Sequence, residues 1–318
     1  MHFKPILFLI IFSLHILCQA QPAPGNDMNI PYLVTFGKES DTKWGDHDFV
    51  QTFFVEVPVN IGQPFYIRIF DPEVGGKIDE AKNHFNTQTR FSIYGGKGAV
   101  SGVDATKDLP VGSKHTGTIL KTKVFSVDPK TDGQWYSFGP FNPTEGELNT
   151  TEYNGYIFKI VAEGISGDDG NLYKYFISSS GSENSALEGA NIFTYEYTFR
   201  LFDEIGSISH IYPFVTDDVV AVHIKTFDLD DDSYMRLVSV AKRGEQIKGS
   251  KEDLWETSIH NIVKEEKKTS LDIQIIKSKT KSNNNMVMSI TNQYGKNIPF
   301  YNIPIGGIPK YKYTIKVK

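Results

Sequence analysis

The chain has 318 residues, of which 22% are charged and 13% aromatic, and its formal net charge is −5. This slightly acidic balance argues against a nucleic-acid partner, because proteins that bind nucleic acids carry a basic excess that offsets the phosphate charge. The only cysteine is Cys18. The chain therefore forms no internal disulfide, and thiol catalysis downstream of that residue is excluded.

The first twenty residues have the pattern of an export signal. Lys4 supplies the positive start, an apolar block runs from Ile6 to Leu17, and Cys18-Gln19-Ala20 places small residues where signal peptidase cleaves. The block is too short for a comfortable membrane span, and no later apolar run is long enough for one. We therefore predict a signal peptide over residues 1–20 and no transmembrane segment after its removal.

Export sets the expected location of the mature protein, which is secreted, periplasmic or on the cell surface. A large exported chain without disulfides is more natural for a bacterial envelope or secreted protein than for an animal extracellular one. A lipoprotein with Cys18 as the lipidated residue is the alternative. Leu17 disfavours it, because the lipid-attachment signal prefers a small residue at that position.

Strict alternation of side chains that face opposite sides recurs along the first part of the chain, with the period of a half-buried strand. It predicts strands over residues 65–70, 90–94, 156–160, 172–177 and 193–201. Turn-forming pairs such as Gly95-Gly96, Asp132-Gly133 and Asn154-Gly155 lie between these runs. Because each strand must bury one face, a β-sandwich is the expected solution.

Part of this region resembles a known family. The segments Asp48–Pro58, Gln63–Asp71 and Thr89–Gly96 are similar in pattern to the bacterial pre-peptidase C-terminal domains, which are secreted jelly-roll-like β-sandwiches. The resemblance covers residues 48–96 and departs from the family's acidic pair at Thr87-Gln88-Thr89. It implies an accessory domain of an exported protein, used for substrate contact or folding, and it transfers no functional residue.

A second series of alternating runs predicts strands at residues 220–224, 271–275, 286–290 and 311–317. Between them, residues 250–263 show helical spacing behind a capping Ser250, and an edge strand is the alternative there. The predicted fold is thus all-β, with at most one or two short helices. It comprises a jelly-roll-like sandwich over residues 27–205 and an immunoglobulin-like sandwich over residues 211–318.

The charge divides along the same line. Residues 21–210 carry 15 basic and 25 acidic side chains, a net of −10, whereas residues 211–318 carry 17 and 13, a net of +4. Such a split suggests contact between the two parts or a basic face turned towards an anionic surface. Separate solvated faces of two unrelated domains are the simpler interpretation.

Three acidic clusters predict calcium sites, because carboxylates at close spacing can converge on a hard cation. The predicted ligands are Asp228, Asp230 and Asp232 in one cluster, and Asp168, Asp169 and Asn171 in another. A looser third cluster contains Asp71, Glu73 and Asp79. The alternative is that each cluster is a polar turn whose side chains bond their own backbone.

Aromatic residues beside turns supply the ligand-binding prediction. Trp44, Trp135 and Tyr136 could stack on a sugar or grip a peptide, and the alternative is that they fold inward. The mature histidines are isolated, and no serine-nucleophile turn is complete. We therefore expect a non-enzymatic binding protein for carbohydrate or an envelope protein. The alternatives are an extracellular hydrolase with a carboxylate pair and a structural subunit of a surface assembly.

Overall fold

The computed structural model describes residues 22–41, 49–107, 109–280 and 284–313. It confirms the predicted all-β class, because the described residues contain strands, three short 3-10 helices and no α-helix. These short helices are η1 (Asn26–Met28), η3 (Pro143–Glu145) and η4 (Lys264–Glu266). Among the described residues, no helix is long and apolar enough to cross a membrane.

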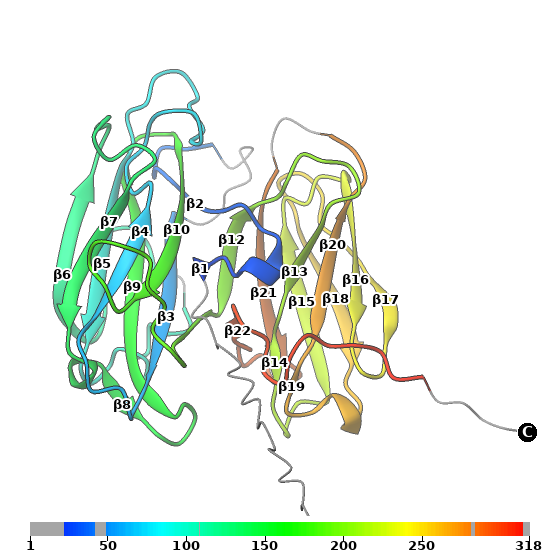
Figure 1. Cartoon of the computed structure of the whole chain (residues 1–318). Coiled ribbons are helices and arrows are strands. Elements are labelled where there is room, and N and C mark those ends of the chain that lie inside the picture. The colour runs from blue at the N-terminus through cyan, green and yellow to red at the C-terminus, as the bar shows by residue number, and fades with distance from the viewer. Residues whose placement is uncertain (1–21, 42–48, 108, 281–283, 314–318) are drawn as a thin grey trace, which may run out of the picture.

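The first sandwich consists of two facing antiparallel sheets (Figure 1). One sheet contains β3 (Val50–Pro58), β5 (Gln88–Gly95), β6 (Thr118–Phe125), β8 (Glu147–Asn149), β9 (Gly155–Ser166), β11 (Asn191–Thr194) and β22 (Phe300–Tyr301). The other contains β1 (Pro22–Ala23), β2 (Tyr32–Phe36), β4 (Phe65–Phe70), β7 (Trp135–Phe141) and β10 (Gly170–Ser178).

The second sandwich lies on the far side of β2 (Figure 1). Its first layer contains β12 (Glu196–Arg200), β15 (Ala221–Phe227), β18 (Trp255–Asn261) and β21 (Asn285–Asn292). Its second layer contains β13 (Ile208–Ile211), β16 (Ser233–Val238), β17 (Arg243–Ile247) and β20 (Asp272–Lys277). A two-stranded ribbon of β14 (Phe214–Val215) and β19 (Thr269–Ser270) lies beside them.

A single sheet runs through both sandwiches. Strand β2 pairs with β10 on one side and with β12 on the other, so the nine-stranded sheet is continuous across the junction. The predicted strand over residues 193–201 is divided at Tyr195 into β11, which pairs with β3, and β12, which pairs with β21. Buried apolar residues of both sandwiches belong to one connected core. The specific jelly-roll-like and immunoglobulin-like arrangements stay predictions.

Strand alternation places the core side chains as expected. In β4, Phe65, Ile67 and Ile69 are fully buried, and in β10, Tyr173 and Tyr175 are fully buried between the sheets. The rings of Phe53, Phe91 and the two tyrosines contact one another edge to face, with centroids 5.1–6.4 Å apart. Such edge-to-face pairs add to the stabilisation that burial provides.

Two predicted elements are wrong over the residues that the structure describes. The expected helix at residues 250–263 is instead the edge strand β18, which pairs with β15 along its whole length. The open edge of β15 outweighs the helical spacing, and the β-branched Thr257 and Ile259 suit a strand. The C-terminal strand does not begin at Tyr311–Tyr313, where the chain has no regular structure.

Candidate functional site

The strongest candidate site lies in two loops at one end of the first sandwich. One loop leaves β4 at Asp71, and the other enters β7 after Asp132-Gly133; because β4 and β7 are paired, these loops are neighbours. Asp71, Glu73 and Asp132 each offer a carboxylate oxygen, and these oxygens lie within 4.8 Å of one another. We call these three residues the acidic cluster.

Backbone hydrogen bonds connect the two loops around the cluster. The Asp71 amide donates to the Gln134 carbonyl at 2.9 Å, and the Gly133 amide donates to Asp71 Oδ1 at 2.8 Å. The Asp128 amide donates to Glu73 Oε2 at 2.7 Å. Each of the two acids therefore has one oxygen fixed by the opposite loop.

The other carboxylate oxygens of the acidic cluster have few hydrogen-bond or ion-pair partners. Asp71 is fully buried, and its Oδ2 has no hydrogen-bond partner. Burial raises the pKa of Asp71 to about 6; the nearby Asp132 adds to this rise, while the Gly133 amide opposes it. Burial also raises the pKa of Glu73. None of the three acids forms an ion pair within the described ranges.

Two further residues border the acidic cluster without completing it. Asp79, which the sequence placed in this cluster, accepts hydrogen bonds from the backbone of Gly75 at 2.7 Å and of Leu172 at 2.6 Å. Asn171 donates to the Pro72 carbonyl at 2.9 Å, and its buried Oδ1 has no hydrogen-bond partner. The third carboxylate of the cluster comes from Asp132 and not from Asp79, the residue expected there. The sequence did not indicate Asp132 as a metal ligand.

The donor set fits a hard cation. Carboxylates buried together without a counter-charge must either take up protons or bind a cation. The cluster offers oxygen atoms and no nitrogen or sulfur, which suits Ca²⁺ or Mg²⁺ better than zinc.

The turn that contains Asp168 and Asp169 has a different construction. The buried Asp169 carboxylate accepts backbone hydrogen bonds from Lys82, Asn86 and Thr87. Asp168 Oδ1 accepts a hydrogen bond from the Asn86 side chain at 2.9 Å. These carboxylates organise the loop that precedes β5, and the structure does not bring them into the acidic cluster.

The Asp228–Asp232 run is divided by the structure. Asp232 forms a buried ion pair with Lys277. Asp228 is 2% exposed and instead accepts a hydrogen bond from the Asp253 amide at 3.1 Å. Burial, followed by the proximity of Asp230 and Asp253, raises the pKa of Asp228 to about 8.

The predicted aromatic residues do not form one site. Trp44 lies outside the described residues. Tyr136 packs against the core, where its ring contacts Phe125 and Phe138 with centroids 5.0 Å away. Trp135, its neighbour in β7, must point to the opposite, outer face of the sheet.

On that outer face, Trp135 belongs to a group of half-buried rings. Its centroid lies 5.4 Å from that of Phe70 and 6.2 Å from that of Phe176. The Arg68 guanidinium lies 5.4 Å from the Trp135 ring and donates hydrogen bonds to Ser137 and Asn184. We call Phe70, Trp135 and Phe176 the ring face.

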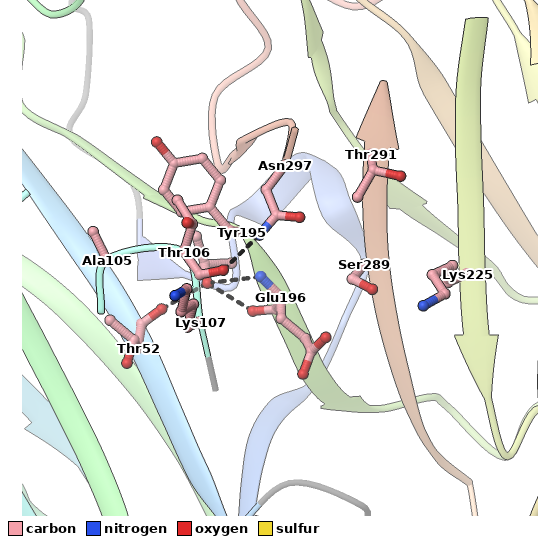
Figure 2. Close-up of a pocket in the computed structure, with 11 residues that line it drawn as sticks. Thr52, Ala105, Thr106, Lys107, Tyr195, Glu196, Lys225, Ser289, Thr291 and Asn297 are labelled. Carbon is pink, nitrogen blue, oxygen red and sulfur yellow. Dashed lines mark hydrogen bonds between the residues drawn. The ribbon is translucent and has the colours of Figure 1, made fainter. Parts of the chain in front are cut away.

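A polar cleft of about 200 Å³ lies at the junction of the two sandwiches (Figure 2). Glu196, Ser289 and Lys225 are aligned across β12, β21 and β15 along its wall. The opposite wall includes Thr52 and Lys107 of the first sandwich, and Asn297 bridges the walls through the Thr106 carbonyl at 2.7 Å. The cleft is suited in size and polarity to a small polar molecule.

Comparisons with known proteins add no functional information. The chain matches no model of a known protein family and no curated protein.

Proposed function

We propose that this chain is an exported, non-enzymatic binding protein that contacts carbohydrate through the ring face and binds Ca²⁺ at the acidic cluster. The observation that carries this proposal is the continuity of the two features. Asp71 directly follows Phe70 in the chain, and the Gly133-Gln134 backbone that bonds Asp71 leads directly into Trp135. A cation in the cluster would thus fix both loops that position the rings.

Calcium is the cation that the cluster fits best. Ca²⁺ accepts six to eight oxygen ligands in flexible geometry, whereas Mg²⁺ demands a near-ideal octahedron. The acidic cluster combines two aspartates and a glutamate from two loops, with Asp71 Oδ2 still unpartnered. Water or backbone carbonyls would complete such a shell.

Carbohydrate is the partner class that suits the ring face. A sugar ring has an apolar face of C–H groups that stacks on an aromatic ring, and hydroxyls at its rim that need hydrogen-bonding groups. Trp135 and Phe70 supply the rings, and the exposed Asn184, held by Arg68, supplies a polar group alongside.

The cation is tested by calorimetric titration of the metal-free protein with CaCl₂. We expect binding by the parent protein and at least tenfold weaker binding by Asp71→Asn, because the variant loses the unpartnered carboxylate oxygen. The matched control is Asp27→Asn, which changes an exposed aspartate in η1. If Asp71→Asn binds Ca²⁺ at the site as tightly as the parent does, the acidic cluster is not the site.

The carbohydrate is tested on a panel of immobilised polysaccharides, with and without EDTA. We expect Trp135→Ala and EDTA each to reduce retention by more than tenfold, and Trp255→Ala, which changes an exposed tryptophan of the second sandwich, to leave it unchanged. If Trp135→Ala is retained as strongly as the parent, the ring face is not the carbohydrate site. If Lys107→Ala loses retention instead, the carbohydrate binds in the junction cleft.

A further inference from the structure

The second sandwich contains a buried lysine that the proposed function does not use. Lys277 is the last residue of β20 and pairs with Ser233, the first residue of β16, so Asp232 comes beside it. Asn284 directly precedes β21, which belongs to the other layer of the same sandwich. The side chains of Lys277, Asp232 and Asn284 are in contact, and these residues are 3%, 2% and 4% exposed.

The lysine amine contacts both of the other groups. Lys277 Nζ donates hydrogen bonds to Asp232 Oδ2 and to Asn284 Oδ1. Asn284 Nδ2 donates instead to Oδ1 of Asp203, an exposed residue. The amine thus lies between a carboxylate and the carbonyl side of a carboxamide, whereas the carboxamide nitrogen faces an exposed side chain.

Backbone hydrogen bonds hold the three groups in place. The amides of Ser278 and Lys279 donate to the Asp232 carbonyl at 2.7 and 2.9 Å. The Leu201 amide, directly after β12, donates to the Asn284 carbonyl at 2.8 Å. The contact between the lysine, the acid and the carboxamide is therefore fixed by the surrounding strands.

Burial favours a reaction between these groups. A lysine ammonium has no free electron pair and does not attack a carboxamide. Burial disfavours the charged forms of both members of an ion pair, which favours transfer of a proton from Lys277 Nζ to Asp232. A desolvated, neutral lysine is a nucleophile, and its fixed contact with the carboxamide replaces a bimolecular encounter by an intramolecular one.

We propose that Lys277 and Asn284 form an intramolecular amide cross-link, with Asp232 as the acid–base group. Nζ attacks Asn284 Cγ, and a new C–N bond forms. Asp232 accepts a proton from Nζ and returns one to Nδ2, the Cγ–Nδ2 bond breaks, and Nδ2 leaves as ammonia. Nothing is oxidised or reduced, and no further reactant is needed.

The cross-link would connect the two layers of the second sandwich, because β20 and β21 belong to different sheets. Cysteine cannot provide such a connection, since Cys18 is the only one in the chain. The proposed cross-link shares no residue with the acidic cluster or the ring face, so it goes beyond the proposed function and is independent of it.

Mass spectrometry of the purified full chain tests the cross-link. We expect an intact mass about 17 Da below that of the amino-acid sequence, because one ammonia is lost. Cyclisation of an N-terminal glutamine such as Gln21 would give the same loss, so a tryptic digest must locate it. Trypsin does not cleave after an acylated lysine, and the digest should contain a branched peptide that joins residues 269–279 to residues 282–296.

Two variants and one control assign the roles. Lys277→Met removes the nucleophile and Asp232→Asn removes the acid–base group, so each should abolish the branched peptide. The matched control is Lys279→Met, which replaces an exposed lysine two residues away and should keep the cross-link. Circular dichroism of each variant shows whether it is folded.

The parent protein alone can overturn the proposal. If trypsin cleaves the folded parent completely after Lys277 and no branched peptide is found, Lys277 and Asn284 are not cross-linked. A mass loss that maps only to the N-terminal peptide has the same meaning. A branched peptide that persists in folded Asp232→Asn contradicts the role of Asp232.

Discussion

Asp104 and Asp71 are both buried aspartates in loops of the first sandwich, yet their environments are opposite. Asp104 is 2.8 Å from the Nζ of the buried Lys159 and accepts the Thr116 amide at 3.0 Å. Although burial opposes ionisation, Lys159 and Thr116 lower the pKa of Asp104 to about 2. Asp71 has no such cation among the described residues, and burial raises its pKa to about 6. The partner, rather than burial, decides which acid needs an external ligand.

The same contrast recurs within one loop of the second sandwich. Asp232 has Lys277 as its partner, whereas Asp228 has the amide of Asp253 and faces further acids. A buried acid that carries its own lysine is complete as folded.

Replacing Lys159 should give the largest effect on the free energy of unfolding. Lys159→Met leaves Asp104 buried without its cation, and breaking such a buried pair costs about 3–5 kcal/mol of unfolding free energy. Urea unfolding monitored by circular dichroism measures the change.

The double variant Lys159→Met/Asp104→Leu is the control for this experiment. Because it removes both charges, it should recover most of the loss. If Lys159→Met alone costs less than about 1 kcal/mol, the contrast between compensated and uncompensated acids fails.

The next largest effect should come from acid, which weakens the ion pair between Asp104 and Lys159. The pKa of Asp104 is about 2 in the folded protein and about 3.9 in an unfolded chain. A lowered folded pKa gives stability that is present above the unfolded value and is lost as pH falls through the folded one. The parent protein should therefore lose its advantage over Asp104→Asn between about pH 4 and pH 2.

The expected size of this acid-sensitive component is about 2.6 kcal/mol at most. Urea unfolding of the parent and of Asp104→Asn across that pH range measures the component. Parallel pH profiles for the two proteins would contradict it.

Sequence periodicity predicted much of the fold, because alternate side chains of the strands face the core, as Phe65, Ile67 and Ile69 of β4 do. The pattern could not reveal that β2 joins the two sandwiches into one sheet. Strand pairing between segments so distant in sequence leaves no local signal. For residues 250–263 the helix expected first is wrong and the alternative, an edge strand, is found as β18; few of its side chains are buried, so the pattern separates the two poorly.

The candidate site was predicted in part for the same reason. Asp71 and Glu73 are close in sequence, so their clustering was visible. Asp132 joins them through the β4–β7 pairing, and Asp253 joins Asp228 through the β15–β18 pairing. The Asp132-Gly133 turn was recognised, but its position against Asp71 depends on a strand pairing that composition does not encode.

The smallest expected effect separates backbone geometry from charge. Gly133 has a φ of 64° and donates its amide to Asp71, and an added Cβ there meets no atom within 4 Å. Gly133→Ala therefore adds strain without a clash, at a cost of about 1 kcal/mol. Gly133→Asn should cost less, since asparagine tolerates the left-handed region.

Gly133→Ala and Asp71→Asn should thus give opposite results on one pair of measurements, urea unfolding in EDTA and calorimetric CaCl₂ titration. Gly133→Ala lowers metal-free stability and keeps Ca²⁺ binding within about threefold, because the amide and all three carboxylates remain. Asp71→Asn keeps metal-free stability and loses Ca²⁺ binding at the acidic cluster, because it removes an uncompensated buried charge that the cation there requires. If both variants lose stability in EDTA to the same extent, Asp71 acts as a structural acid like Asp104, and the distinction between the two regions collapses.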